Sequence, residues 1–395
     1  MALYDCVVVG AGIMGSCTAY HLAKEGKKTL LLEQFFLPHS RGGSSGQSRI
    51  IRKAYSKHYY GDMVAGSYEM WKEFEKESGE KLQYDTGFLV IGLDGTSSPS
   101  GEELKNMRAT LQRFNIPHDE LSNDQIKERY PTLNYPSSYR AVLDKAAGVL
   151  VAEKCVNVVQ NLAKRFGCEI RDGTKVTEVI PGDDVTTVQT SNGNFKAKSV
   201  VLAAGAWTEK IINTLGIVLP VVPQRATVMY WKSKDPQQHL AKDGYPSISC
   251  RIEDGRGFFY LIPSLEYPGY CKASFHDYRR NSPDYCDPDS RNLASDAAFI
   301  NDVATYIRRY MPGLEDKPSI TEYCMYTESP DRDYVLDAHP KHKNIFIATG
   351  FSGHGFKLGP AVGKVLAEMA TGCQPSYDIS HFKIGRFLNK AKARL

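Results

Sequence analysis

The sequence predicts an α/β fold in two domains, the second of them α+β in character, and three observations lead to this prediction. The chain is 395 residues long, which exceeds the usual size of a single hydrophobic core. Residues 4–33 follow the pattern of a strand, a helix and a second strand. Strand-rich segments in the middle of the chain interrupt helix–strand segments at its two ends, so both domains are expected to be discontinuous in sequence.

Composition and charge argue against several classes of partner and location for this protein. The net charge is +4, but the basic residues are interleaved with acidic ones, which argues against a nucleic-acid partner. No apolar run is long enough to cross a bilayer, so no membrane partner is expected. The N-terminal segment "MALYDCVVVGAGIMGS" lacks the charged region of a signal peptide. The nine cysteines include no CxxC pair, which indicates reduced thiols in an intracellular protein.

The first strand–helix–strand unit predicts a Rossmann-like nucleotide-binding domain. The apolar, β-branched run at 4–9 leads directly into "GAGIMG", a helical pattern follows over 16–27, and "KTLLLE" at 28–33 is the second strand. A GxGxxG motif is weak evidence alone, but here strand, helix, second strand and terminal acid all agree. The sequence therefore predicts a dinucleotide site.

The residues of this motif have separate expected roles. Gly10 permits the tight turn, Gly12 lets the backbone approach a pyrophosphate, and Gly15 lets the helix pack closely on the strand. The helix N-terminus offers free amides to the phosphates. Glu33, at the end of the second strand, is placed to bind ribose hydroxyls.

The segments up to residue 167 alternate between loops, helices and strands. We expect a glycine- and serine-rich loop at 39–55, a helix that buries Val64, Tyr68, Trp71 and Phe74, a strand at 86–95, a helix that begins with a capping box of Ser100 and Glu103, and an amphipathic helix at 152–167.

The remaining segments are rich in strands. We expect a β-meander at 175–207 with a hairpin turn at Asn192-Gly193, strands at 226–231, 257–262 and 270–275, a helix at 295–311, a buried strand at 344–350, and a glycine-rich loop that enters a helix ending near residue 370.

Four motifs together resemble the monomeric sarcosine oxidase family, including its peroxisomal L-pipecolate oxidases. They are "GAGIMG", "GQSRIIRKAY", "CMYTESPDRDYVLD" and "GFSGHGFKLGP". The resemblance implies an FAD-binding Rossmann-like domain at 1–80, 151–216 and 320–395. It also implies a substrate domain at 81–150 and 217–319 that is built on a large mixed β-sheet, in a protein that is a monomer.

The same resemblance implies an activity. Relatives of this kind oxidise the secondary amine of a small amino acid, such as sarcosine, L-pipecolate or L-proline, to an imine and reduce oxygen to hydrogen peroxide. Three alternatives remain open: a flavin-dependent dehydrogenase with another electron acceptor, a non-catalytic flavin-binding redox protein, and an NAD dehydrogenase.

Cys324, in "TEYCMYT", has two interpretations. From its apolar and aromatic neighbours alone it is a small buried residue. The resemblance implies instead that its sulfur attaches covalently to FAD. The other cysteines are interpreted as small core residues.

Three cations are candidates for binding anions. Two apolar residues separate Arg49 from Arg52, which favours partly buried guanidinium groups that need anionic partners over a solvated basic pair. The resemblance implies that Arg52 and Lys357 bind the substrate carboxylate and that Arg49 lies beside the flavin. The alternative for Lys357 is a lysine that extends from a helix end to solvent.

Lys272 and His276 are four residues apart on a predicted strand, which places them on one face. The resemblance implies that Lys272 activates oxygen and that His276 and Tyr260 line the substrate pocket; the alternative for those two is an ordinary hydrogen-bonded residue. The implied catalytic residues are thus Lys272, Arg49, His276 and Tyr260. The implied cofactor-binding residues are Gly10, Gly12, Gly15, Glu33, Ser45, Arg49, Val176, Cys324, Gly353, Gly355 and Lys357.

Ser45 departs from the family pattern, since many relatives carry histidine at this position. A serine cannot act as a general base without its own activator, so the role of an ionisable group that relatives can have at this position is not expected here. The cations Arg49, Lys272 and Lys357 are expected to lower the pKa of the substrate amine and so favour its reactive neutral form.

The chain ends in Ala393-Arg394-Leu395, which is close to the S-K-L address that a peroxisomal import receptor reads. A solvated basic tail is the alternative. Because an oxidase that makes peroxide suits a compartment that destroys it, we expect the peroxisome as its location.

Overall fold

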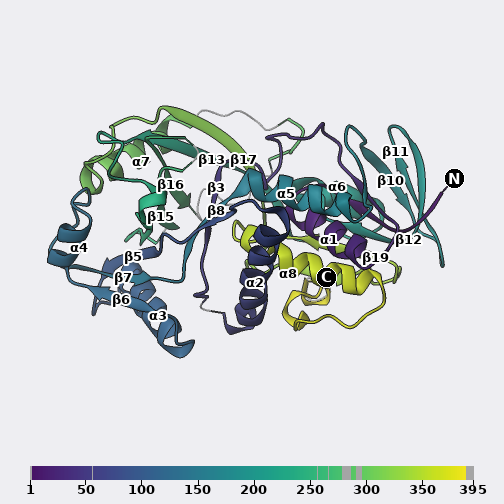
Figure 1. The fold of residues 1–395 in the computed structure, drawn as a ribbon, viewed down its shortest axis with the longest axis horizontal. Helices are drawn as coiled ribbons and strands as arrows, with labels where there is room; N and C mark the ends of the chain where they lie inside the picture. Colours follow the sequence, from purple (N-terminus) through teal and green to yellow (C-terminus); the bar gives the residue numbers. More distant parts are fainter. Residues whose placement is uncertain are drawn as a thin grey trace, which may run out of the picture.

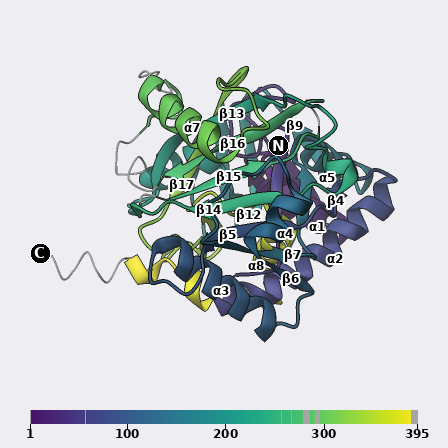
Figure 2. The ribbon, with the colours of Figure 1, turned by 90° about the vertical axis from the view of Figure 1, so that its left-hand side faces the viewer.

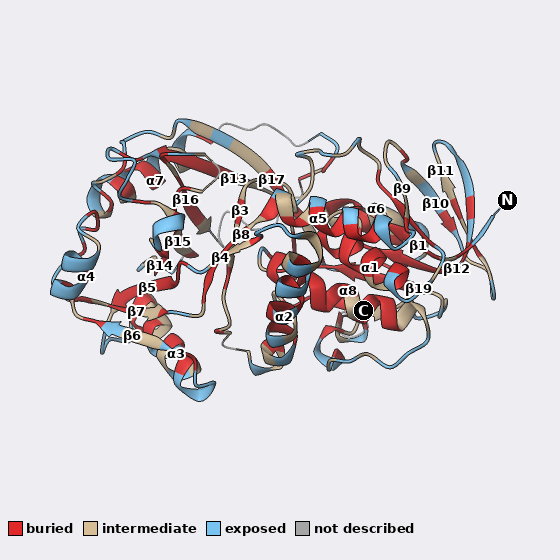
Figure 3. Ribbon diagram, in the orientation of Figure 1, coloured by how far each residue is buried: buried red, intermediate tan, exposed pale blue. Residues whose placement is uncertain are grey.

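The computed structural model describes residues 2–55, 57–255, 257–265, 267–277, 286–290 and 296–387. Two large sheets lie at opposite ends of an elongated molecule, and the first of them is packed against several helices (Figure 1). Buried residues follow the strands and the inward faces of the helices in both halves (Figure 3). The predicted α/β fold with a large mixed second sheet is confirmed.

The first sheet has a parallel centre in the order β19-β12-β1-β2-β9, to which β10, β11 and β18 add antiparallel pairs. Its strands are β1 Leu3–Val9, β2 Thr29–Leu32, β9 Glu169–Arg171, β10 Val176–Ile180, β11 Thr186–Thr190, β12 Gly193–Leu202, β18 Val335–Ala338 and β19 Ile345–Thr349.

Side chains of this sheet are buried in two separate cores, one on each face, since successive side chains of a strand point to opposite sides. Cys6 and Val8 pack with the helices on one face, while Val7 and Val9 belong to a separate core on the other. Helix α1 packs against both α5 and α8. The helices of this half are α1 Ile13–Lys24, α2 Gly61–Ser78, α5 Ala152–Arg165, α6 Thr208–Thr214 and α8 Gly359–Ala370.

The second sheet has the order β17-β13-β16-β15-β14-β5-β7-β6 and is mixed, since β14 and β5 run parallel and the other neighbours are antiparallel. Its strands are β5 Phe88–Leu93, β6 His118–Leu121, β7 Tyr139–Asp144, β13 Val222–Lys232, β14 Ser247–Arg251, β15 Gly257–Ile262, β16 Tyr270–Asp277 and β17 Ile320–Glu328.

Helices cover both faces of this second sheet, as the end-on view shows (Figure 2). Side chains of α4 (Asn123–Arg129) and α7 (Ala297–Tyr310) pack on one face, and those of α3 (Pro99–Arg113) pack on the other. A third sheet of β3 (Ser48–Ile51), β8 (Gly148–Val151) and β4 (Gln83–Tyr84) lies between the two halves.

The predicted domain boundaries stay a prediction. Strand β17 follows the boundary predicted at residue 320, yet it pairs with β13 along the whole of β17, from Ile320 to Glu328. This pairing brings one end of β17 close to the 3-10 helix η2 (Gly205–Trp207) of the first half. The strand therefore connects the two halves at the place where the pockets described below meet.

The predicted capping box of α3 is wrong. The helix begins at Pro99, and its N-cap is Ser98, whose Oγ accepts a hydrogen bond from the Gly101 amide. Ser100 instead accepts a hydrogen bond from the amide of Leu93, at the end of β5. The tertiary contact with the strand therefore decides which serine caps the helix.

Candidate functional site

The turn between β1 and α1 has the geometry that the glycine motif predicts. Gly10 has a φ of +100°, and a Cβ at this position would lie 2.5 Å from the carbonyl oxygen of Ala203. Gly15 also contacts Gly10 closely, so a side chain would not fit there either. Gly12 is the N-cap of α1, and the nearest atom to a Cβ there would be Ser44 Oγ at 3.0 Å. The turn therefore leaves backbone exposed to a neighbouring pocket.

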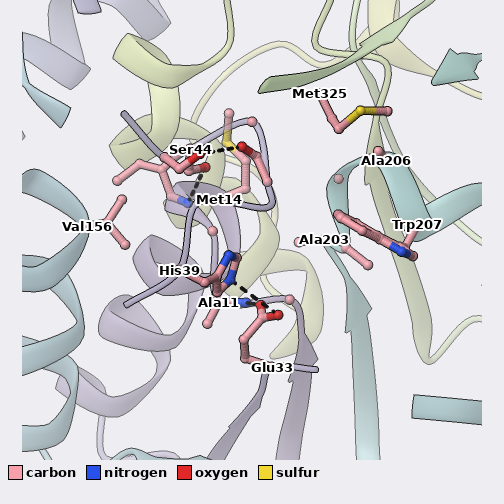
Figure 4. A pocket seen from close by; sticks show the side chains of 18 of the residues that line it. Ala11, Met14, Glu33, His39, Ser44, Val156, Ala203, Ala206, Trp207 and Met325 are labelled. Atoms are coloured by element: carbon pink, nitrogen blue, oxygen red, sulfur yellow. Dashed lines mark hydrogen bonds and ion pairs between the residues drawn. The ribbon is translucent and has the colours of Figure 1, made fainter. Parts of the chain in front are cut away.

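Glu33 lies at the end of β2 and faces this turn (Figure 4). Its carboxylate accepts hydrogen bonds from the amides of Ala11 at 2.9 Å and Phe35 at 3.1 Å, and His39 Nε2 lies 3.4 Å away. A carboxylate has about four lone-pair sites, so it can still accept from ribose hydroxyls. Glu33 thus holds the glycine turn in place as well as lining the pocket.

We call the space beside this turn the glycine-loop pocket. It is lined by Gly10, Gly12, Glu33, Ser44, Ser45, Arg49, Val176, Trp207, Met325, Gly353 and Gly355, among others. Of the two serines, Ser44 accepts a hydrogen bond from the Ile13 amide at the start of α1, whereas Ser45 donates to the carbonyl of Gly42. Sequence reasoning selected Ser45 and missed Ser44.

A second cavity of about 610 Å³ adjoins this pocket and contains the predicted substrate residues. It is lined by Arg49, Arg52, Tyr55, Tyr260, Lys272, His276, Cys324, Tyr326, Gly353, His354, Phe356 and Lys357, among others. Arg49, Tyr326, Gly353 and Phe356 line both spaces, so the two join at these residues.

Strand β17 passes along this junction. Cys324 and Tyr326 line the second cavity, while Met325 lines the glycine-loop pocket, which follows from the alternation of side chains along a strand. Cys324 is 8% exposed and packs against Val228 and Tyr230 of β13. Cys324 therefore lines the second cavity two residues from Tyr326, which lines both spaces.

Arg49 lies at the same junction, and the hydrogen bonds of its guanidinium go to uncharged groups. It donates to the carbonyl oxygens of Ser48, Gly43 and Ser45 at 2.6–2.9 Å and lies over the ring of Phe356. These bonds hold the group in place and leave its positive charge without a paired carboxylate among the residues that the structure describes.

Arg52 and Lys357 lie together in the second cavity. The Arg52 guanidinium lies between the rings of Tyr55 and Phe88, and Lys357 Nζ donates to Tyr55 Oη and the His354 carbonyl, both at 3.0 Å. Within the described part of the chain, neither forms an ion pair with a carboxylate. Two partly or fully buried basic side chains that line one cavity favour an anionic ligand.

Lys272, His276 and Tyr260 complete the wall on the second sheet. Lys272 and His276 both face the cavity from β16, and Lys272 donates to the Ser48 carbonyl at 3.3 Å. Burial lowers the pKa of His276 to about 3, with Arg332 and Arg251 adding to the effect, so its imidazole is neutral at physiological pH. Burial also raises the pKa of Tyr260, which keeps its phenol protonated.

Ser44, Tyr55, Tyr326 and His354 are among the lining residues that sequence reasoning did not select. Tyr326 lies two residues from Cys324 on a strand, and that spacing is a signal that predicts a shared face. Tyr55 carries no such signal, because its contacts to Lys357 and to His354 join residues far apart in the chain and depend on the tertiary fold.

The joined spaces fit a dinucleotide that carries a ring system. The helix N-terminus and glycine turn suit a pyrophosphate, Glu33 suits a ribose, and the junction at Arg49, Tyr326, Gly353 and Phe356 suits the ring. A Cβ at Gly353 would lie 2.8 Å from His276 Cε1, so the backbone there approaches the junction without a side chain.

No helix of the described residues is long and apolar enough to cross a membrane.

Comparison with known proteins gives three findings. A family model described as FAD dependent oxidoreductase matches residues 5–369. The chain is 41% identical to peroxisomal sarcosine oxidase of Homo sapiens, over 100% of this chain and 98% of that protein, and 34% identical to monomeric sarcosine oxidase of Bacillus sp. (strain NS-129), over 99% and 98%. Its fold is similar to that of NikD, an unusual amino acid oxidase, with a TM-score of 0.85 at 22% identity over 97% of this chain and 98% of that one.

Proposed function

This chain belongs to the FAD dependent oxidoreductases, and from that premise we propose that it oxidises the secondary amine of a small amino acid to an imine. Sarcosine, L-pipecolate and L-proline are the proposed substrates. When bound, FAD supplies the two-electron chemistry, taking electrons from the substrate and passing them to an acceptor. The sarcosine oxidases that match across the whole chain support this reaction.

The observation that carries the proposal is the pair of basic side chains, Arg52 and Lys357, in the cavity next to the glycine-loop pocket. An amino-acid carboxylate would accept hydrogen bonds from both and so direct the amine toward the junction with that pocket. His276 and Tyr260 are uncharged and would line the rest of the amine's surroundings. The fixed cations Arg49 and Lys272 favour the neutral form of the amine.

The test uses substrate pairs that differ only in the carboxylate. Peroxide formation is measured with L-pipecolate against piperidine and with L-proline against pyrrolidine. We expect the amino acids to be oxidised and the simple amines to be poor substrates. Arg52→Met and Lys357→Met should mainly raise KM, by about 10- to 100-fold, because each removes a charged hydrogen-bonding partner. Equal activity on the amines with and without a carboxylate would contradict the proposal.

We propose oxygen as the electron acceptor, with Lys272 as the residue that favours its reduction. Lys272 is 7% exposed and faces the second cavity, where a positive charge has a stronger effect than in water. A dehydrogenase with another acceptor is the competing function. Flavin that bleaches with substrate but is not recoloured by air, with no peroxide formed, would support the dehydrogenase.

We also propose covalent attachment of FAD through Cys324 and location in the peroxisome. The position of Cys324 in the second cavity, two residues from the junction residue Tyr326, supports the first. The peroxisomal human relative and the terminal Ala393-Arg394-Leu395, which lies outside the described residues, support the second. A protein with residues added after Leu395 should lose import, because the receptor reads a free C-terminus; unchanged import would contradict this location signal.

A further inference from the structure

Lys357 has an environment that is unusual for an ammonium group. It lies on the 3-10 helix η4 (Phe356–Leu358) and is 8% exposed. Its Nζ has two hydrogen-bond partners, Tyr55 Oη and the carbonyl oxygen of His354. Both partners are uncharged, so neither offsets the cost of removing a positive charge from water. The same two contacts also suit a neutral amine, whose lone pair can accept the Tyr55 proton.

The groups behind Lys357 add no negative charge. His354 Nε2 lies 3.0 Å from the Arg332 carbonyl, and its Nδ1 lies 2.9 Å from Tyr334 Oη. The first contact requires a proton on Nε2, and in the neutral ring Nδ1 accepts from Tyr334. Burial and Lys357 itself lower the pKa of His354 to about 3. Burial raises the pKa of Tyr55 to about 12, so its phenol stays protonated.

Among the described residues, the other titratable groups around the cavity do not pair with Lys357 as a counter-charge. They are Arg49 and Arg52 from β3 and the loop that follows it, Arg251 from β14, Tyr260 from β15, Lys272 and His276 from β16, Tyr326 from β17, and Glu102 and Glu103 from α3. Glu103 lies 3.3 Å from Arg251 and Glu102 lies 3.6 Å from Lys105, and neither carboxylate bonds to Lys357. From α2, Trp71 donates to the Lys357 carbonyl only.

From this arrangement we propose that Lys357 is a neutral amine in the enzyme without substrate, and that it takes up the proton which the substrate ammonium loses when the amino acid binds. The inference rests on the proposed function and deepens it. Lys357 then both holds the carboxylate and accepts the amine proton. Its burial beside Arg52 lowers its pKa well below the usual value for lysine, which agrees with the neutral state.

The proton balance is simple. The amino acid arrives as a zwitterion, with a carboxylate and a secondary ammonium. One N–H bond of that ammonium breaks and leaves its electron pair on the substrate nitrogen, while the lone pair of Lys357 Nζ forms a new N–H bond. The substrate becomes an anion with a neutral amine, and Lys357 becomes the cation that pairs with its carboxylate. No proton is exchanged with solution, and the neutral amine has the lone pair that its oxidation requires.

The test uses a ligand that brings a carboxylate but no proton. Methylthioacetate has sulfur in place of the NH of sarcosine, so Lys357 must take its proton from solution. The holoenzyme is mixed with methylthioacetate in weak buffer at about pH 8.5, below the usual lysine pKa. Binding is followed by the visible flavin spectrum, and proton uptake by a pH indicator. We expect about one proton taken up for each ligand bound.

Substitutions of Lys357 test whether this residue takes up the proton when the ligand binds. Lys357→Arg carries a permanent charge, so it should bind the ligand with no proton uptake. Lys357→Met, which cannot be protonated, should also show none. Lys364→Met is the matched control, because Lys364 lies on α8 with its side chain 40% exposed and outside the cavity, and uptake should be unchanged.

The outcomes separate this inference from the proposed function. Binding to the parent enzyme without proton uptake would contradict the inference and leave the proposed function intact. Equal uptake by the parent and Lys357→Arg would place the proton on another group and would also contradict it. Failure of the parent to bind methylthioacetate would contradict the carboxylate site itself, and the inference with it.

Discussion

Cys324 is the residue whose chemistry the sequence alone leaves most open, and a denaturation experiment decides it. We expect the yellow colour of the protein to stay with the polypeptide after acid or detergent treatment. Cys324→Ala should release its flavin under the same treatment, because the proposed attachment runs through the sulfur. Cys271→Ala is the matched control, since Cys271 is fully buried in the core of the second sheet and away from both pockets. Free release of flavin from the unmutated chain would exclude covalent attachment.

Lys272 allows the two halves of the reaction to be separated. Lys272→Met keeps roughly the length of the side chain and removes the charge. Anaerobic bleaching of the flavin by substrate should stay within about tenfold, a barrier change of roughly 1.4 kcal/mol. The return of colour in air should slow far more, because reducing oxygen develops negative charge in a poorly solvated site.

Stopped-flow spectroscopy measures both rates for Lys272→Met. Lys232→Met is the control, since Lys232 is an exposed lysine on the neighbouring strand β13. If both rates fall equally, or if the recolouring rate does not change, the proposed oxygen role of Lys272 is wrong.

Residues of the site could be predicted where the alternation of side chains along a strand determines which way they point. Lys272 and His276 share a strand face because side chains alternate, and both line the cavity. The contact between Lys357 and Tyr55 joins residues far apart in the chain, and no spacing in the sequence encodes it. Neutral His354 was missed for the same reason, because its hydrogen bonds to Tyr334 and Arg332 form only in the folded protein.

The β1–α1 turn gives a test at the scale of one element. Gly10→Ala forces a side chain into a left-handed backbone and against the Ala203 carbonyl. Gly26→Ala is the matched control, because Gly26 also has a positive φ, of +75°, but nothing lies within 4 Å of its Cβ position. The control should cost about 1–2 kcal/mol in unfolding free energy.

Gly10→Ala should cost more than Gly26→Ala and also reduce the flavin content of the purified protein, because the turn that faces the pocket must shift. Thermal unfolding and the flavin-to-protein absorbance ratio measure the two effects. Equal destabilisation by both substitutions, with full flavin content, would show that the turn tolerates a side chain.

Elements were predicted well where their signals are local and agree with one another. Strand β1, helix α1 and strand β2 follow from apolar runs and glycines that are adjacent in sequence. The start of α3 was predicted wrongly because Ser98 and Ser100 are both chemically able to cap a helix. The amide of Leu93 binds Ser100 in the folded protein and leaves Ser98 as the cap. The capping propensity of serine alone does not reveal that the Leu93 amide takes the Ser100 side chain away from the helix N-terminus.

At the scale of the molecule, the site is made from segments that lie far apart in the chain. The glycine-loop pocket takes residues from the β1–α1 turn, from α5, from the segment after β12, from β17 and from the loop before α8. The sequence indicates that the domains are discontinuous, because strand-rich and helix-rich segments interrupt one another. It does not indicate that β17 would pair with the second sheet while its residues line the first pocket, since pairing partners are set by the tertiary fold.

Because the glycine-loop pocket is built from segments far apart in the chain, we predict that bound FAD stabilises the whole molecule. A ligand that binds only the folded state adds stability according to its saturation, about 4 kcal/mol at a thousandfold excess over Kd. The Cys324→Ala variant, from which flavin can be removed, should therefore melt several degrees lower without FAD and recover when FAD is added. NAD⁺ is the control ligand, since it lacks the flavin ring that the junction of Arg49, Tyr326, Gly353 and Phe356 would hold. A melting temperature that FAD does not raise, or that NAD⁺ raises equally, would mean that the ring does not reach this junction and that the two halves are held together by protein contacts alone.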